Sequence, residues 1–310
     1  MYKNLGYSFG GENPYMALCH YLAGRDNESC PGQITFSARK LHISYTKSAI
    51  DSFAHYIDKN SMDIYVHSPF TINLSDPFTK YSPNSDKWVI DGIRKHLKLC
   101  ESMHTKGLVF HVGKHKNIKS VQEATDMMEN SIRKVIDSAT EMTPFILETP
   151  VGCGTEILTT FEEFGNFYEK FEKDERFKVC IDTCHVFACG HDPLGYITRW
   201  IDTYGSDSLA LIHFNDSKKP QGSKVDRHER PGLGHIGENV LSKIADVAYT
   251  NGIPIVMEWH KNICNYNIIL KFEDGTKFGF LMINDSKGFY SGYTSISDYY
   301  TDTFSLSSLV

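Results

Sequence analysis

The sequence predicts an α/β protein built as a closed (β/α)8 barrel, the TIM-barrel architecture, on three observations. The chain has 310 residues, and a barrel of this kind takes roughly 250, which leaves some chain over. Short apolar runs alternate with helical patterns or turns, and strands that alternate with helices indicate a parallel sheet. Because the runs number eight, a closed barrel is favoured over an open sheet.

The predicted elements follow one another along the chain. The strands are KNLGYSF near Leu5, QITFSA near Ile34, DIYVHS near Tyr65, GLVFHV near Val109, PFILET near Ile146, KVCIDT near Ile181, LALIHF near Leu211 and IPIVMEW near Val256. Between them, apolar periodicity predicts one helix from Lys87 to Gly107, with its glycine at the end, and another from Val121 to Ala139.

The chain after Trp259 departs from the barrel pattern. It shows no clear eighth helix, and KFEDGTKFGFLMIND predicts a hairpin with Asp-Gly as its turn. The final segment, SGYTSISDYYTDTFSLSSLV, is rich in Ser, Thr and Tyr and is either loosely ordered or packed as an edge. We therefore expect a barrel domain at residues 1–260 and a non-helical C-terminal extension at residues 261–310, to which the sequence assigns no role.

Composition excludes several classes of protein. A hydrophobic content of 41% and a charged content of 23% are typical of a soluble globular protein. The sequence contains no apolar run of about 18 residues, which is the length needed to cross a membrane, and its start lacks a secretion signal. We therefore expect an intracellular protein, in the cytoplasm, the nucleus or a virion, and a monomer. The eight cysteines contain no Cys-x-x-Cys pair, which argues against a closed thiolate zinc site. Cys19 and Cys30 are either reduced or bridged.

Metal-type side chains end six consecutive predicted strands. The clearest case is VCIDTCHVFACGHD, in which Asp182 ends an apolar strand and a turn begun at Thr183 could aim His185 into the same cavity. In a parallel barrel, catalytic groups lie at the carboxyl ends of the strands, on one rim. The full set on this rim comprises His67, His111, Glu148, Asp182, His185, His213, Asp226, His228 and Glu258.

The size and chemistry of this set point to a metal cluster. A single histidine at a strand end is more often a hydrogen-bonded core residue, but six successive strand ends of this type are hard to attribute to chance. Carboxylate and imidazole ligands without thiolate suit zinc or manganese. Nine ligands are too many for one ion, and could hold two or three. Ions about 3.5–4 Å apart promote in-line phosphoryl displacement, so the substrate implied is a phosphodiester, with Glu148 as a bridge.

Basic loops leave the same rim, although the formal net charge of the chain is −6. They suit a nucleic-acid groove on an acidic protein, although solvated, charged loops are the simpler alternative. His115 is expected at the rim or on a phosphate, and Phe70 or Tyr45 would either stack in the groove or belong to the core. The basic residues of the three loops are Arg39, Lys40, Lys47, Lys114, Lys116, Lys119, Lys218, Lys219, Lys224, Arg227 and Arg230.

The segment PGLGHIG, from Pro231 to Gly237, matches a dinucleotide-binding pattern of glycines. That pattern requires a strand directly before it, whereas here a charged loop precedes it. We therefore expect a tight backbone turn that leads into a helix from Glu238.

These residues resemble the endonuclease IV family of abasic-site endonucleases, zinc-dependent TIM barrels of base-excision repair. The likeness runs from about Leu5 to Glu258, and all nine ligand positions of the family pattern are filled. The matching motifs are HSPFTINL from His67, FHVGKH around His111, ILETPVGCG around Glu148, CIDTCHVFACGHD, and HFNDSK with GSKVDRHERPGLGHIG.

The resemblance implies the ligand sets and the reaction. The hydroxide between the first two of three zinc ions would attack the phosphorus 5′ to an abasic site in duplex DNA, leaving a 3′-hydroxyl and a 5′-deoxyribose phosphate. The third zinc would stabilise the leaving oxygen, and manganese is an alternative at one site. Glu148 and Glu258 are the expected catalytic carboxylates. The implied sets are His67, His111 and Glu148; Glu148, Asp182, His213 and Glu258; and His185, Asp226 and His228.

The family also implies how DNA is bound. Such enzymes clean blocked 3′ ends, act as 3′→5′ exonucleases, and flip out the abasic nucleotide while bending the duplex. The expected DNA-contacting residues here are Arg39, Lys40, Phe70, Lys114, His115, Lys218, Lys224 and Arg227.

Two departures and two alternatives accompany this prediction. Phe70 stands where the family often has tyrosine, so it keeps a stacking face and loses a hydroxyl, and the usual last barrel helix is not recognisable after Glu258. A metal-dependent sugar isomerase or epimerase would use fewer ligands and no basic loops. A catalytically silent DNA-binding module would have no use for so many metal-type residues.

Overall fold

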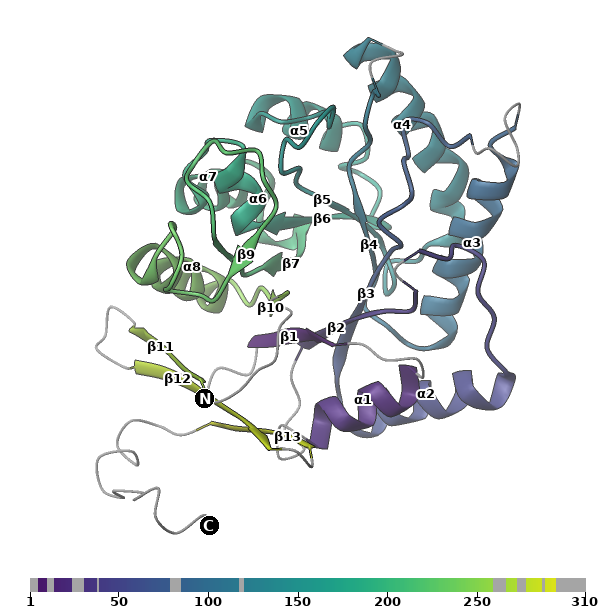
Figure 1. Ribbon diagram of the computed structural model, residues 1–310. Coiled ribbons are helices and arrows are strands. Elements are labelled where there is room, and N and C mark those ends of the chain that lie inside the picture. Colours follow the sequence, from purple (N-terminus) through teal and green to yellow (C-terminus); the bar gives the residue numbers. More distant parts are fainter. Residues whose placement is uncertain are drawn as a thin grey trace, which may run out of the picture.

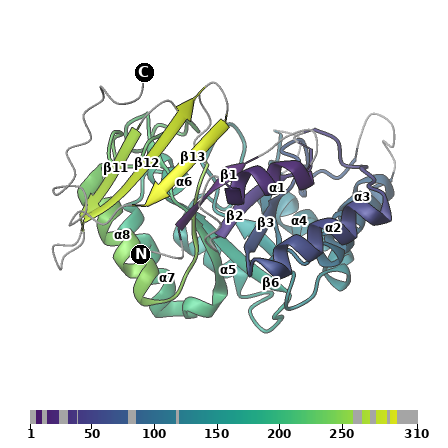
Figure 2. The same cartoon turned by 90° about the horizontal axis from the view of Figure 1, so that it is seen from below.

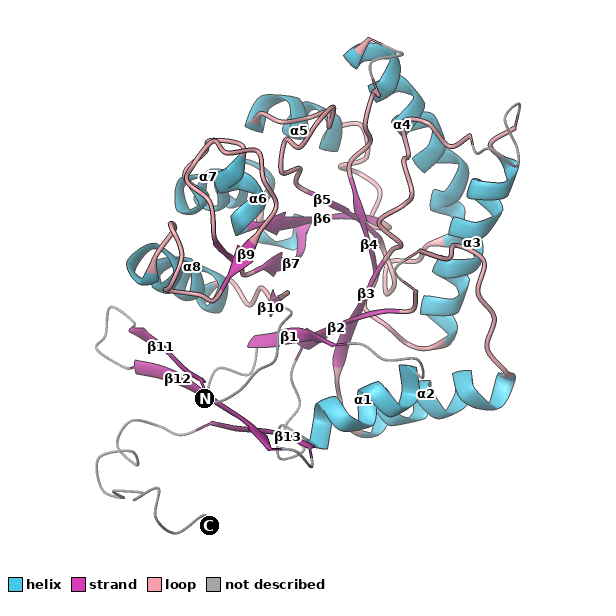
Figure 3. Ribbon diagram, viewed as in Figure 1, coloured by secondary structure: helices cyan, strands magenta, loops and turns pink. Residues whose placement is uncertain are grey.

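Eight parallel strands close into a barrel, with the helices outside it (Figures 1 and 3). The computed structural model describes residues 5–9, 14–23, 31–37, 39–78, 85–116, 120–258, 266–271, 277–285 and 288–293. The strand order around the barrel is β1-β10-β7-β6-β5-β4-β3-β2. The strands are β1 (Leu5–Phe9), β2 (Pro31–Thr35), β3 (Asp63–His67), β4 (Leu108–His111), β5 (Phe145–Glu148), β6 (Phe177–Asp182), β7 (Leu209–His213) and β10 (Ile255–Met257). The predicted TIM barrel and its eight strands are confirmed.

Helices follow the strands in chain order. They are α1 (Pro14–Ala23), α2 (Lys47–Lys59), α3 (Lys87–Ser102), α4 (Val121–Val135), α5 (Phe161–Tyr168), α6 (Thr183–Ala188), α7 (Pro193–Tyr204) and α8 (Glu238–Thr250), with 3-10 turns η1 (Ile136–Ser138) and η2 (Ser206–Ser208). Thus α4 and η1 together account for the helix predicted from Val121 to Ala139. None of the described helices is both long and apolar enough to cross a membrane.

The helix predicted from Lys87 to Gly107 begins as expected, but its predicted end at Gly107 is wrong. Helix α3 stops at Ser102, and His104 takes the left-handed conformation, with φ of 57°, that was expected of a glycine. Gly107 serves the next strand instead, because its φ is 139° and a side chain there would come within 2.5 Å of Ile146 Cδ1. Glycine is therefore required by the close approach of β5 rather than by the helix.

The barrel has an outer and an inner apolar layer, because successive residues of a strand point to opposite faces. In the outer layer, under the helices, the rings of Phe110, Phe145 and Phe177 stack across β4, β5 and β6 with centroids 4.4 and 5.8 Å apart. The interior is filled by a small separate cluster just below the rim, formed by Tyr65, Val109, Ile146, Cys180, Leu211 and Val256. The barrel is therefore a packed core and carries its chemistry above this cluster.

Beyond Glu258, the described residues form strands and no helix. Strands β11 (Tyr266–Lys271), β12 (Lys277–Asp285) and β13 (Gly288–Tyr293) make an antiparallel sheet, which lies beside α8, with β13 toward α1 (Figures 1 and 2). The β11–β12 pairing agrees with the predicted hairpin, although its Asp-Gly turn lies outside the described residues. Cys30 and residues 294–310 also lie outside the described residues, so both expected states of Cys19 and Cys30, reduced or bridged, stay as the sequence left them. The domain boundary remains a prediction.

Candidate metal centre

The metal-type side chains form the layer of the barrel directly above the interior cluster. Residues two apart on a strand share a face, so that His67, for example, stands above Tyr65. Strand pairing then sets neighbours side by side, as at His111 and Glu148, which are register partners on β4 and β5. Each member of the interior cluster has such a residue two positions later, and these are His67, His111, Glu148, Asp182, His213 and Glu258.

The first group joins His67 and His111 to Glu148. The Nε2 atoms of the two histidines lie 3.3 and 3.1 Å from Glu148 Oε2. The other ring nitrogen of His67, Nδ1, lies 2.8 Å from the backbone oxygen of Ser68 and can donate to it. In the neutral ring this hydrogen bond leaves the lone pair of Nε2 facing the carboxylate, and the three ligand atoms lie within 4.8 Å of one another.

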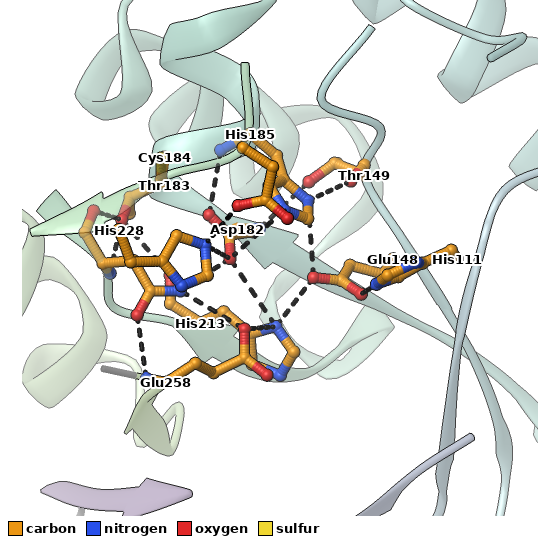
Figure 4. Close-up of polar contacts among 12 residues, drawn as sticks. His111, Glu148, Thr149, Asp182, Thr183, Cys184, His185, His213, His228 and Glu258 are labelled. Atoms are coloured by element: carbon orange, nitrogen blue, oxygen red, sulfur yellow. Dashed lines mark hydrogen bonds and ion pairs between the residues drawn. The ribbon is translucent and has the colours of Figure 1, made fainter. Parts of the chain in front are cut away.

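The second group shares Glu148 with the first and adds Asp182, His213 and Glu258 (Figure 4). His213 Nδ1 lies 2.8 Å from Glu148 Oε1, 3.2 Å from Glu258 Oε2 and 3.8 Å from Asp182 Oδ2. Since Glu148 turns Oε2 toward the first group and Oε1 toward the second, one buried carboxylate joins both.

A turn brings the third group into the same cavity. Helix α6 begins at Thr183, as predicted, and Asp182 is its N-cap, accepting a hydrogen bond of 2.9 Å from the backbone N–H of His185. His185 Nδ1 lies 2.9 Å from the backbone oxygen of Thr149. Donation to that oxygen directs the Nε2 atom of His185 away from Thr149 and toward the loop after β7.

That loop contributes Asp226 and His228 to the third group. Asp226 lies 3.7 Å from His185 Nε2 and 3.0 Å from His228 Nε2. Both Nε2 atoms are buried, and neither forms a hydrogen bond. Buried polar atoms are normally satisfied, so two such atoms facing a carboxylate mark a place suited to a cation.

Opposite charges compensate one another across the three groups. Burial alone would raise the pKa of Glu148, but His213, His111 and His185 hold it well below its usual range. Burial raises the pKa of Asp182 despite its histidine neighbours. Burial opposes the charging of His67, yet Glu148 and Glu258 raise its pKa to about 9. Protons on the imidazoles thus supply positive charge that a bound cation would otherwise supply.

Two buried amide side chains, which the sequence analysis did not single out, form hydrogen bonds to the metal-type residues. They are Gln33 and Asn215. Gln33 Nε2 donates to Glu258 Oε1 at 2.6 Å, and Gln33 Oε1 lies 2.8 Å from His213 Nε2. Asn215 Nδ2 donates to Asp182 Oδ2 at 2.7 Å, while the backbone N–H of Glu258 donates to Asn215 Oδ1 at 2.8 Å. The one available signal was the two-residue alternation, which places Asn215 two positions after His213.

Comparison with known proteins identifies the family. A model of xylose isomerase-like TIM barrels matches residues 33–278. A probable endonuclease 4 of Methanosphaera stadtmanae is 32% identical over 222 residues, covering 70% of this chain and 78% of that one. Another, from Mycoplasmopsis agalactiae, is 33% identical over 251 residues, covering 77% and 87%. The chain belongs to the endonuclease IV family.

Solved structures agree with this endonuclease IV fold. The endonuclease IV of Thermus thermophilus superimposes with a TM-score of 0.67 at 19% identity, covering 84% of this chain and 93% of that one. A D-tagatose 3-epimerase-like protein superimposes with a TM-score of 0.60 at 17% identity, covering 84% and 91%. At such identities both likenesses concern the fold alone.

The nitrogen and oxygen atoms that the three groups gather suit divalent metal ions. Imidazole nitrogens and carboxylate oxygens are zinc and manganese ligands. The thiols of Cys180 and Cys184 also lie within reach of the groups. Burial, however, raises the pKa of Cys180 well above its usual range and that of Cys184 to about 12. The two thiols are therefore protonated in the metal-free protein, and most ligand atoms of the groups are imidazole nitrogens and carboxylate oxygens.

The basic residues on the rim of this barrel are partly neutralised by acidic neighbours. Lys114 pairs with Glu156 at 3.1 Å, and Lys116 pairs with Asp76 at 3.0 Å. The segment from His111 to Gln122 has no acid of its own, but neighbouring loops supply two. Lys218 pairs with a glutamate at 3.3 Å. Exposed rim residues include Arg39, Lys40, Lys224 and Arg227, whereas His115 is half-buried and Lys119 lies outside the described residues.

The two candidate stacking aromatics differ in exposure. Phe70, after β3, is 56% exposed. Tyr45 is only partly exposed, and its ring packs edge-to-face on Phe36 with centroids 5.8 Å apart. Phe70 alone of this pair therefore presents a free aromatic face, and its contact with DNA remains a prediction, like those of the basic residues.

The glycine-rich turn of this chain, Pro231 to Gly237, binds the side-chain carboxylate of Asp216. Asp216 is fully buried, and its carboxylate accepts hydrogen bonds of 2.9 Å from the backbone N–H groups of Gly232, Gly234 and Ile236. A side chain at position 234 would lie 2.4 Å from Asp216 Oδ1. The turn leads into α8 at Glu238, as predicted, and a carboxylate occupies the nest where a dinucleotide phosphate would lie.

Proposed function

We propose that the chain is a DNA-repair hydrolase that cuts the phosphodiester 5′ to abasic sites in duplex DNA, with three zinc ions as cofactor. The observation that carries the proposal is the gathering of nine metal-type residues into three adjoining groups, each with ligand atoms within 4.8 Å of one another. Membership of the endonuclease IV family, whose curated relatives are named endonuclease 4, supports the DNA substrate.

Each group would hold one zinc ion. When bound, the ions would activate a water and neutralise charge on the oxygens of the scissile phosphate. Glu148 would join the first two sites through its two oxygens, and its complete burial keeps both away from bulk water. Glu258 would complete the second site, and Asp226 would face solvent at the third, where its side chain is 44% exposed. Manganese is an alternative to zinc at one site.

The rim would bind the damaged duplex. Arg39, Lys40, Lys224 and Arg227 are exposed and would contact phosphates. Lys114 and Lys218 would have to exchange their glutamate partners for phosphate. Phe70 would stack against a base, which needs an exposed aromatic face and no hydroxyl. His115 completes the set of proposed contacts.

The proposed products are a 3′-hydroxyl and a 5′-deoxyribose phosphate. We extend the proposal to the removal of blocked 3′ ends and to 3′→5′ exonuclease activity, both of which are phosphodiester cleavages that the same site could perform. All nine proposed ligands come from one chain, so the site needs no second subunit, and we propose that the enzyme acts as a monomer.

A sugar isomerase or epimerase is the second candidate. Its support is the superposition on a D-tagatose 3-epimerase-like protein with a TM-score of 0.60. That likeness comes at 17% identity, against 32% for the Methanosphaera relative. The larger ligand set and the exposed basic rim favour the nuclease.

A nicking assay separates the two candidates. The protein is incubated with duplex DNA that carries one abasic analogue, with and without a chelator, and separately with free ketoses. We expect a single 5′ cut that the chelator abolishes, and loss of the cut in Glu148→Gln. Glu129→Gln, which alters a carboxylate on the outer face of α4, should cut like the wild type. Sugar turnover without nicking would establish the isomerase instead.

A further inference from the structure

Gln33 connects β2 to two metal-type residues that are far away in the sequence. It is fully buried, and its amide contacts Glu258 at 2.6 Å and His213 at 2.8 Å. We propose that Gln33 is a positioning residue: it holds His213 in the tautomer whose Nδ1 atom is free to bind metal. The inference rests on the proposed zinc site and adds to it a residue that is not itself a ligand.

The orientation of the Gln33 amide follows from its neighbours. An ionised carboxylate can only accept hydrogen bonds, so the amide must turn its NH2 group toward Glu258. The reverse orientation would set two oxygens 2.6 Å apart. The other oxygen of Glu258, Oε2, accepts a hydrogen bond of 3.3 Å from Asn215 Nδ2 and lies 3.2 Å from His213 Nδ1, so the whole carboxylate is surrounded by donors. The amide oxygen of Gln33 is therefore fixed toward His213.

This orientation determines which nitrogen of His213 carries a proton in the neutral ring. An amide oxygen can only accept, so His213 Nε2 must be the N–H donor of the 2.8 Å contact. The lone pair of the neutral imidazole then lies on Nδ1. That atom faces Glu148, Glu258 and Asp182 at 2.8, 3.2 and 3.8 Å. The carboxylate orients the amide, and the amide selects the tautomer that a metal ligand needs.

Two other histidines of the centre are oriented in the same way, but by the backbone. His67 Nδ1 lies 2.8 Å from the oxygen of Ser68, and His185 Nδ1 lies 2.9 Å from the oxygen of Thr149. These carbonyl groups survive any side-chain substitution. At His213 a side chain performs this role, so the tautomer there can be changed by replacing one residue.

The test compares Gln33→Leu and Gln33→Glu with the wild type. Zinc affinity is measured by competition with a chelator of known affinity, and the ring nitrogens of His213 are observed by NMR in zinc-loaded protein labelled with 15N-histidine. The control is Tyr65→Phe, which removes a part-buried hydrogen bond of 2.9 Å from the Tyr65 hydroxyl to the backbone oxygen of Ala210, and so breaks a bond inside the barrel that involves no metal-type side chain. Circular dichroism confirms that each variant is folded.

We expect Gln33→Leu to bind zinc at the second group about 10- to 100-fold less tightly, as is usual for such supporting residues. The Nε2–H signal of His213 should shift and exchange faster with water, because it loses its acceptor. Gln33→Glu keeps an acceptor for His213 and should keep that signal, although it loses the donor to Glu258. Tyr65→Phe should match the wild type in both measurements.

The outcomes separate this inference from the proposed function. If the wild type binds zinc and Gln33→Leu leaves both the affinity and the His213 signals unchanged, Gln33 has no positioning role and the nuclease proposal stands. If Tyr65→Phe lowers affinity as much as Gln33→Leu, the effect is general loosening of the barrel, and the inference is wrong. A wild-type protein that binds no zinc overturns both.

Discussion

Replacing Asp216 by asparagine should loosen the loop that carries Asp226 and His228. Asp216 Oδ2 accepts hydrogen bonds of 2.9 Å from two backbone N–H groups, while Oδ1 accepts others of 2.7 and 2.9 Å. Asparagine keeps only one acceptor oxygen, so its NH2 group would face two donors whichever way it turned. At about 1.5–3 kcal/mol for each hydrogen bond to a charged group, the loss is about 3–6 kcal/mol.

This cost falls on residues 216–237, and therefore on the third group. We expect Asp216→Asn to bind one zinc fewer than the wild type while the sites around Glu148 keep theirs, as measured by equilibrium dialysis with elemental analysis. The control is Asp207→Asn in an exposed turn before β7, which should bind zinc normally. Full zinc binding by Asp216→Asn, with a wild-type melting temperature, would show that the carboxylate does not hold the loop.

Three further predictions concern DNA and pH. Phe70→Ala should weaken binding to an abasic duplex by about 1–3 kcal/mol, measured by fluorescence anisotropy, because a stacked ring is lost. Phe70→Tyr should bind like the wild type, and so should the control Met142→Ala, which removes an exposed side chain before β5. Equal affinities for Phe70→Ala and the wild type would show that Phe70 does not contact DNA. Lys224→Ala should lower by about 1 the slope of the logarithm of the DNA-binding constant against the logarithm of the salt concentration. The control Lys173→Ala, on the loop before β6, should leave this slope unchanged. An unchanged slope in Lys224→Ala would mean that Lys224 contacts no phosphate. In chelated protein, and against the effect of burial, Glu148 raises the pKa of His67 to about 9 and Asp226 raises that of His228 to about 9. Both pKa values exceed the value near 6.5 of an unfolded histidine, so the stability that these two ion pairs add is complete below about pH 6.5 and is lost as the pH rises through about 9. The melting temperature should therefore fall between these pH values. A constant melting temperature would contradict the pairing of His67 with Glu148 and of His228 with Asp226.

The parts of the site that depend on strand alternation were predictable. An interior residue such as Ile146 fixes the direction of Glu148 two positions later, and a parallel barrel places all such residues on one rim. The turn that brings His185 beside Asp182 was also predictable, because an aspartate before Thr183 is a good helix cap. Local rules and one architectural rule thus sufficed to predict which candidate ligands gather on the rim.

The supporting contacts were not predictable, because they depend on distances across the barrel. The contact between Gln33 and His213 spans 180 positions, and a glutamine within an apolar strand gives no sign of its partner. Asp216 likewise looks like any loop acid until the glycine turn folds around it. The pairing of Lys114 with Glu156 shows why charge counted along one segment overstated how basic the rim is.

The helix end predicted at Gly107 failed for a different reason. Glycine after a helical pattern commonly marks a helix end, but here the packing of Ile146 against Gly107 explains the glycine. His104 took the left-handed position at the helix end, which non-glycine residues adopt less often. Sequence alone could not separate these two uses of glycine.

Elemental analysis of the purified wild type and of Glu148→Ala tests the central claim most directly. Three ligand groups predict three zinc ions per wild-type chain. They predict one ion in the variant, since the first two groups share Glu148 and the third does not. A wild-type chain without bound metal, or a variant that keeps all its zinc, would contradict the assignment of these residues to one metal centre.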